Sequence, residues 1–185
     1  MIWLVLGLVL WVGAHVFKRI APGARAALGA PGKGVVALVI VVSLVLMIVG
    51  YRSAPVVPVY TPFAGAGHLN NLLMLVALWV YAAGMSKGVL WTKIRHPQLT
   101  GVAIWAVAHL LVNGDLASVL LFGTLLIWAL GSIRVVSAAE GPWLPHAPGS
   151  IRRDLAMVAI SLVVYAALAW VHIWTGHNPF GGTYG

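Results

Sequence analysis

Apolar residues occur along the chain in six long runs, each separated from the next by a short polar or basic segment. The runs cover residues 2–17, 35–51, 69–85, 98–112, 116–133 and 155–174. A helix of about 20 mostly apolar residues crosses a bilayer core that is about 30 Å thick. The pattern therefore predicts an all-α fold, a polytopic transmembrane bundle of about six helices.

Turn residues mark the ends of several runs. Pro97 fits the first turn of the fourth helix, where its missing N–H removes no helical hydrogen bond. The segment 113–115, Asn-Gly-Asp, predicts a tight turn between the fourth and fifth helices, with Asp115 as the cap of the fifth. In the long loop predicted after residue 133, we expect Glu140 to pair with Arg134.

Composition supports a membrane protein and excludes several other classes. Hydrophobic residues make up 62% of the chain and charged residues 8%, whereas soluble domains average about 25% charged residues. The 185 residues leave no room for a separate soluble domain, so we expect a single transmembrane domain over residues 1–185. The absence of cysteine excludes disulfides, thiolate metal sites and cysteine nucleophiles.

The formal net charge of +8 indicates membrane orientation and not nucleic-acid binding. Lys and Arg gather after the first, third and fifth runs, and the other two connections hold one and none. Basic loops face the cytoplasm, so both termini are predicted to lie outside it. The first residues are apolar, without a basic stretch or an Ala-x-Ala site, and so predict no cleavable signal peptide.

Two histidines lie inside apolar runs, where polar side chains are rare and usually functional. His15 follows Gly13 and Ala14, and His109 follows Ala106 and Ala108 at close range. Small neighbours let a flat ligand or another helix approach closely. At about 1.5 Å per residue, the two imidazoles lie within about 6 Å of the same depth. The spacing is compatible with a haem b clamped by two histidines, since neutral imidazole is a good iron ligand. The alternative is that each histidine only hydrogen-bonds within the bundle.

A basic cluster precedes the fourth run. Lys93, Arg95 and His96 stand beside Pro97 at a predicted helix start, where free N–H groups and the helix dipole attract anions. Arg95 and His96 are therefore candidates for binding a haem propionate or another anionic cofactor group. The alternative is an interfacial anchor that merely starts the helix.

One motif extends from the start of the fourth run to the start of the fifth. It comprises Ile94-Arg95-His96-Pro97-Gln98-Leu99-Thr100-Gly101, Trp105, His109-Leu110 and Asn113-Gly114-Asp115-Leu116-Ala117-Ser118. This motif resembles the signature of the NnrU family. His15 with its following basic loop and Gly50-Tyr51 also fit that family, and the resemblance extends over almost the whole chain.

The resemblance implies a small multi-pass protein of the bacterial inner membrane, associated with nitric oxide and nitrite metabolism in denitrifiers. The same domain occurs in plant 15-cis-ζ-carotene isomerase, a haem b protein that isomerises a buried polyene in a redox-dependent way. Carried over by motif, its ligands fall on His15 and His109. The chain lacks that enzyme's longer N-terminal extension, so the resemblance does not carry over its substrate. It implies either a haem-dependent cis-trans isomerase of a lipophilic polyene or a role in nitrogen-oxide respiration.

Two further functions stay open at this point. One is a cofactor-free assembly factor for a respiratory complex, in which the histidines only pack. The other follows from Arg-His-Pro-x-x-x-Gly at a helix start, which also resembles isoprenylcysteine carboxyl methyltransferase and implies S-adenosylmethionine as the cofactor. That family normally carries paired glutamates and tyrosines after the next helix, and here only Arg134 and Glu140 occupy the region.

Overall fold

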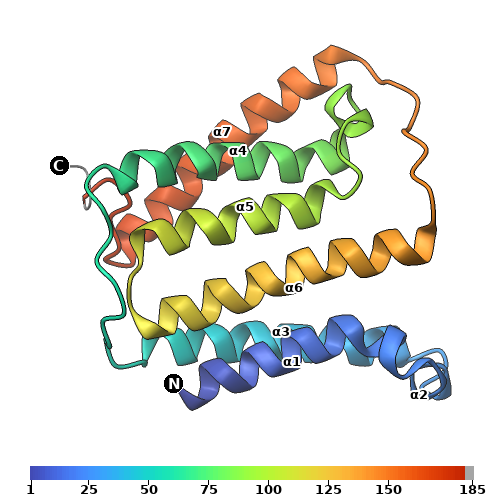
Figure 1. Cartoon of the computed structure of the whole chain (residues 1–185), viewed down its shortest axis with the longest axis horizontal. Coiled ribbons are helices and arrows are strands. Elements are labelled where there is room, and N and C mark those ends of the chain that lie inside the picture. The colour runs from blue at the N-terminus through green and yellow to red at the C-terminus, as the bar shows by residue number, and fades with distance from the viewer. Residues whose placement is uncertain (182–185) are drawn as a thin grey trace. The chain divides into compact units, whose positions relative to one another are not determined.

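The computed structural model describes residues 1–181, and within them the chain is helical and has no β-strand. The all-α prediction is confirmed. Figure 1 shows the elements in chain order. They are α1 (Ile2–Ile20), α2 (Pro22–Ala27), α3 (Gly32–Arg52), α4 (Ala66–Ser86), the 3₁₀ turn η1 (Leu90–Thr92), α5 (Pro97–Val112), α6 (Leu116–Glu140) and α7 (Ile151–Trp174).

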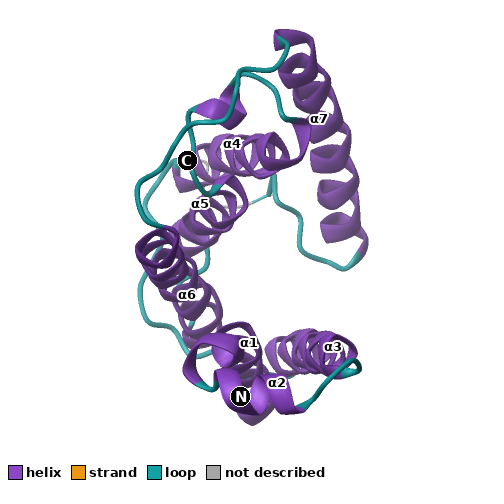
Figure 2. Ribbon diagram, turned by 90° about the vertical axis from the view of Figure 1, so that its right-hand side faces the viewer, coloured by secondary structure: helices purple, strands orange, loops and turns teal. Residues whose placement is uncertain are grey.

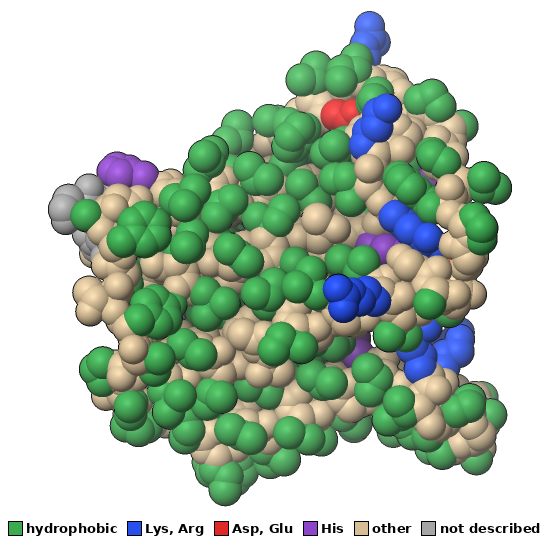
Figure 3. Space-filling model, viewed as in Figure 1, with side chains coloured by type: hydrophobic (Ala, Val, Ile, Leu, Met, Phe, Trp, Pro, Cys, Tyr) green, Lys and Arg blue, Asp and Glu red, His purple; other side chains and the backbone are tan. Residues whose placement is uncertain are grey.

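Five of these helices, α1, α3, α4, α6 and α7, are long and apolar enough to cross a membrane. The sixth apolar helix, α5, has 16 residues and is about 24 Å long at about 1.5 Å per residue. Large apolar side chains face outward: Leu38 is 64% exposed, Ile127 75% and Val163 70%. Figure 3 shows hydrophobic side chains spread across the visible face. Such a surface requires lipid as its solvent, and the chain is a multi-pass membrane protein.

Most helices extend a few residues beyond the predicted apolar runs, and two differences change the picture. Helix α6 continues past residue 133 to Glu140, so Arg134 lies in the helix and not in the loop that was expected. Arginine is a good helix former, and the apolar run ends before the helix does. The basic loop after α1 also contains the short helix α2, which begins at Pro22 in the first helical position.

The chain divides into two compact units. The first comprises residues 1–59 and 115–124. In it α1 packs against α3, and two glycines let the helices approach closely. A Cβ at Gly7 would lie 2.8 Å from the side chain and backbone of Met47, and a Cβ at Gly50 would meet the backbone of Leu4. Small residues are the usual means of close helix packing in a membrane.

The start of α6 belongs to the first unit and confirms the predicted cap. Asp115 accepts hydrogen bonds from the Ser118 backbone N–H at 3.0 Å and from the Ser118 hydroxyl at 2.5 Å. Because the one hydroxyl proton of Ser118 goes to Asp115, the Tyr51 hydroxyl donates to Ser118 Oγ, at 2.8 Å. The cap therefore also joins α6 to the end of α3.

The second unit comprises residues 60–114 and the chain from Leu125 onward. Helix α4 contacts both α5 and α7 and lies between them in Figure 2. The contact with α5 is close at Gly101, where a Cβ would lie 2.8 Å from Tyr81 Cβ and 2.9 Å from the Ala77 carbonyl oxygen.

Candidate functional site

The first candidate residue, His15, lies in the last third of α1, in the first unit. Its Nδ1 is 2.8 Å from the carbonyl oxygen of Trp11, one turn earlier. The two rings also contact each other, with centroids 4.3 Å apart. The side chain is half-buried. The backbone bond and the indole together restrict the orientation of the imidazole.

The second candidate, His109, lies in the last turn of α5, in the second unit, and repeats the arrangement. Its Nδ1 is 2.9 Å from the Trp105 carbonyl oxygen, and the ring centroids are 5.0 Å apart. Asn113 closes the helix behind it, with its side-chain amide donating to the His109 carbonyl at 2.9 Å. Both candidate ligands are thus the last residue of a Trp-x-x-x-His turn.

The geometry determines which tautomer each imidazole adopts. A carbonyl oxygen only accepts hydrogen bonds, so Nδ1 of His15 and of His109 carries the proton. The neutral ring then has its lone pair on Nε2. An imidazole that donates Nδ1–H to a backbone carbonyl is the form in which histidine commonly ligates a metal. The two residues are therefore chemically suited to bind iron through Nε2.

The small residues beside the two histidines have different surroundings. Ala106 and Ala108 are fully buried on α5, so there the neighbours are packed protein. Gly13 on α1 has open space where a Cβ would stand. It borders a groove of about 460 Å³ whose other lining residues are Val5, Leu8, Val9, Val12, Leu120 and Thr124.

The groove in the first unit follows one face of α1. Residues 5, 8, 9 and 12 repeat at helical spacing, and His15 comes three residues after Val12 on the same face. The volume falls within the range of about 300–1,000 Å³ that is typical of small-molecule pockets. Its lining is neutral and apart from Thr124 apolar, which suits a lipophilic group next to the imidazole.

The other candidates, Arg95 and His96, lie together at the start of α5 in the second unit. Nη2 of Arg95 donates to the carbonyls of Gly141 at 2.8 Å and Ser137 at 3.3 Å, and pairs with Glu140 at 3.4 Å. His96 Nε2 is 2.8 Å from the Ser137 hydroxyl. These contacts attach the start of α5 to the end of α6.

The partner of Glu140 is therefore Arg95, and the expected pair with Arg134 is wrong. In the extended α6, the last turn brings Glu140 to the N-terminal end of α5. The Arg95 guanidinium has one donor left to bind another group, because its buried Nε has no hydrogen-bond partner among residues 1–181.

A comparison with protein-family models matches residues 3–179 to the family described as NnrU protein. The chain belongs to the NnrU family. Searches among curated proteins and among solved structures give no match.

One buried acid of this NnrU family member escaped the sequence analysis. Asp154, in the first turn of α7, is 5% exposed. Its Oδ2 accepts the backbone N–H groups of Val89 and Leu90 at 2.7 and 3.2 Å, which holds η1 against α7. Because Asp154 follows Arg152 and Arg153, the sequence places it in a basic loop. Its contact with η1 is evident only from the structure.

In the same NnrU unit, Trp79 and Ser161 also carry buried polar atoms that the sequence analysis did not single out. The sequence around a serine or tryptophan in an apolar helix does not indicate whether that residue only packs in the bundle or binds a ligand. A local signal was available for the histidine turns, since Trp stands four residues before both His15 and His109.

Proposed function

We propose that this NnrU family member binds one haem b through His15 and His109 and acts in redox-linked chemistry in the membrane. The support is the repeated Trp-x-x-x-His turn, in which the backbone carbonyl takes the Nδ1 proton and the indole packs on the imidazole. Bound haem supplies one-electron redox chemistry at its iron.

The remaining residues of the proposal surround and orient these two ligands. The groove along α1 gives an apolar lining to the face of the helix that carries His15. Arg95 and His96 are proposed to hold an anionic edge of the cofactor, since Arg95 retains an unpartnered Nε–H donor. Two roles for such a haem are proposed. The resemblance to a polyene isomerase supports the isomerisation of a lipophilic polyene, and the association of the family with nitrogen-oxide metabolism supports a role in denitrification.

The experiment is an optical spectrum of the full chain, expressed with an adequate haem supply and purified in mild detergent. The expected result is a low-spin Soret band and a pyridine haemochrome of the b type, with one haem per chain. A colourless protein would contradict the proposal. It would leave a cofactor-free assembly factor or a methyltransferase, and S-adenosylmethionine binding by the colourless protein separates those two.

We also propose that the protein lies in the bacterial inner membrane with both termini outside the cytoplasm. The support is the clustering of Lys and Arg between the end of α1 and the start of α3, after α4, and near the end of α6 and start of α7. A cysteine at the exposed Ser53 should react with an impermeant thiol reagent added to intact cells or spheroplasts. A cysteine at the exposed Ala139 should react only after lysis, and the opposite pattern would reverse the topology.

A further inference from the structure

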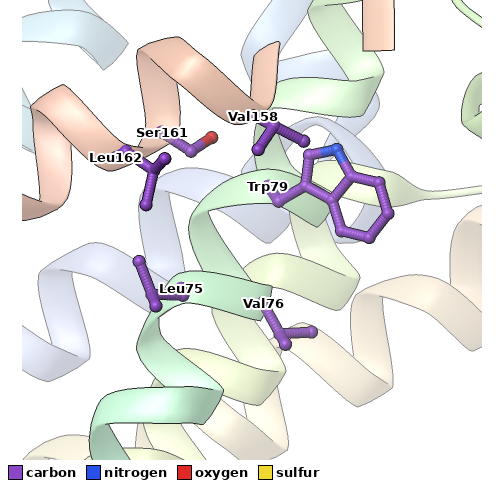
Figure 4. A pocket seen from close by; sticks show the side chains of 6 residues that line it. All are labelled: Leu75, Val76, Trp79, Val158, Ser161 and Leu162. Carbon is purple, nitrogen blue, oxygen red and sulfur yellow. The ribbon is translucent and has the colours of Figure 1, made fainter. Parts of the chain in front are cut away.

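A groove of about 270 Å³ in the second unit has two polar atoms at its walls. Trp79 Nε1 on α4 and Ser161 Oγ on α7 are buried, and neither has a hydrogen-bond partner among residues 1–181. Figure 4 shows the groove, with the Ser161 oxygen directed toward the side where Trp79 lies. The remaining lining residues are apolar: Leu75, Val76, Val158 and Leu162. Polar groups buried in an apolar medium normally have partners.

The other buried serines of the described chain show that Ser161 is unusual. Ser43 donates to the Ile40 carbonyl at 2.7 Å, within its own helix. Ser118 donates to Asp115 and accepts from Tyr51. Ser161 is 5% exposed and makes no such bond, although a helical serine can donate to a carbonyl one turn earlier. Its hydroxyl is therefore available to an outside partner.

The two groups determine the chemistry of that partner. An indole N–H only donates, and a serine hydroxyl can donate as well. No charged side chain lines the groove. A matching ligand is therefore neutral and mostly apolar, and carries oxygen atoms that accept hydrogen bonds.

Depth excludes the ester groups of bilayer phospholipids. At about 1.5 Å per residue, Trp79 lies about 10 Å from the end of α4 at Ser86, and Ser161 lies about 15 Å from the start of α7 at Ile151. The hydrocarbon core is about 30 Å thick and the polar lipid groups lie outside it. The two donors are thus inside the core, where only a molecule dissolved in the hydrocarbon brings an acceptor.

We propose that this groove binds the ring of a lipid-soluble quinone, whose carbonyl oxygens accept from Trp79 Nε1–H and Ser161 Oγ–H. A quinone is a flat ring with acceptors on opposite edges, which matches donors from two different helices. Both polar atoms are sheltered in the structure. Leu162 lines the groove and is 52% exposed, so its side chain can turn aside when the ring enters.

The test uses the full chain in lipid nanodiscs and two probes, decylubiquinone and decylbenzene, which has the same alkyl chain but no carbonyl. Equilibrium dialysis gives the dissociation constants, and infrared spectroscopy follows the carbonyl band of the quinone. The wild-type protein should bind decylubiquinone at least about tenfold more tightly than decylbenzene, with the carbonyl band shifted to lower frequency.

Matched variants assign the effect to the groove. Ser161→Ala and Trp79→Phe should each weaken quinone binding about fivefold to tenfold and reverse part of the infrared shift. Ser161→Thr keeps the hydroxyl and should retain binding, and Ser43→Ala removes a hydroxyl that already has a partner and should change nothing. None of these residues is a proposed haem ligand, so each variant without added quinone should keep the wild-type haem spectrum, and a failure of quinone binding is distinguishable from a failure of haem binding.

Three results would overturn the proposal. Equal affinity for the two probes would show that the groove accepts any hydrocarbon. Unchanged quinone binding in both Ser161→Ala and Trp79→Phe would place the quinone elsewhere. A phospholipid that is retained by the wild-type protein in native mass spectrometry and lost from both variants would identify bilayer lipid as the occupant.

Discussion

The turns that carry His15 and His109 have the same local geometry and different surroundings. Both imidazoles donate Nδ1–H to a Trp carbonyl one turn earlier, at 2.8 and 2.9 Å. The turn in α5 belongs to a helix packed closely on α4, whereas the turn in α1 continues a face that borders an open apolar groove. The hydrogen bond is a local property of the helix, while the packing is a tertiary one. One histidine is thus held mainly by its neighbours, and the other has room beside it for a ligand.

The largest expected effect is on stability, and a matched pair of glycine-to-alanine substitutions compares α5 with α1. Gly101→Ala on α5 places a Cβ 2.8 Å from Tyr81 Cβ, and such overpacking costs about 1–3 kcal/mol. Gly13→Ala on α1 meets open space and should be neutral or stabilising by up to about 1 kcal/mol, because alanine favours the helix. Thermal unfolding in one detergent measures both. Equal melting temperatures for the two variants would contradict the difference in packing.

A smaller effect is expected at the start of α5. Arg95→Lys keeps the charge but loses the planar group whose Nη2 reaches the Gly141 and Ser137 carbonyls together. We expect a loss of about 1–2 kcal/mol in unfolding free energy, with normal membrane insertion and weakened haem retention. Gly141→Ala would not serve as a control, since Gly141 has a positive φ of 73°. Arg134→Lys, elsewhere on α6, is suitable. Full stability in Arg95→Lys would show that the contact with α6 does not need the guanidinium.

The smallest effect concerns the indoles. Trp11→Leu and Trp105→Leu keep the backbone carbonyl and remove the ring that contacts the imidazole. An aromatic contact of this kind contributes about 0.5–1.5 kcal/mol, or about twofold to thirteenfold in the equilibrium between low-spin and high-spin haem. The effect should be larger for Trp11, because Gly13 beside His15 has open space around it, whereas Ala106 and Ala108 beside His109 are fully buried. A larger effect for Trp105 would reverse the comparison.

The sequence predicted the features that depend on residues close together in the chain. The six apolar runs became six apolar helices, Pro97 starts α5, and Asp115 caps α6. The contact between Arg95 and Glu140, by contrast, joins residues 45 positions apart. Neither periodicity nor charge pattern shows which of two arginines reaches a glutamate, so that pairing was predicted incorrectly.

For the candidate site too, the sequence predicted local features and not long-range packing. The position of His15 and His109 inside apolar helices followed from the apolar runs, and the Trp carbonyl bonds follow from helical spacing. The open groove beside Gly13 and the unpartnered hydroxyl of Ser161 could not be predicted. Both features depend on how other helices pack against α1 and α7, and the local sequence of one helix does not determine that packing.

The most direct test of the central proposal compares the visible and electron paramagnetic resonance spectra of three single variants and one double variant. His15→Ala and His109→Ala should each lose the six-coordinate low-spin signal, and the double variant should be little worse than the weaker single variant, because ligands of one iron are not additive. His172→Ala is the matched control, since His172 also bonds Nδ1 to a carbonyl one turn earlier, that of Leu168 at 2.7 Å, but lies exposed near the end of α7. It should keep the wild-type spectrum. A wild-type low-spin spectrum in either His15→Ala or His109→Ala would show that the substituted histidine is not an axial ligand.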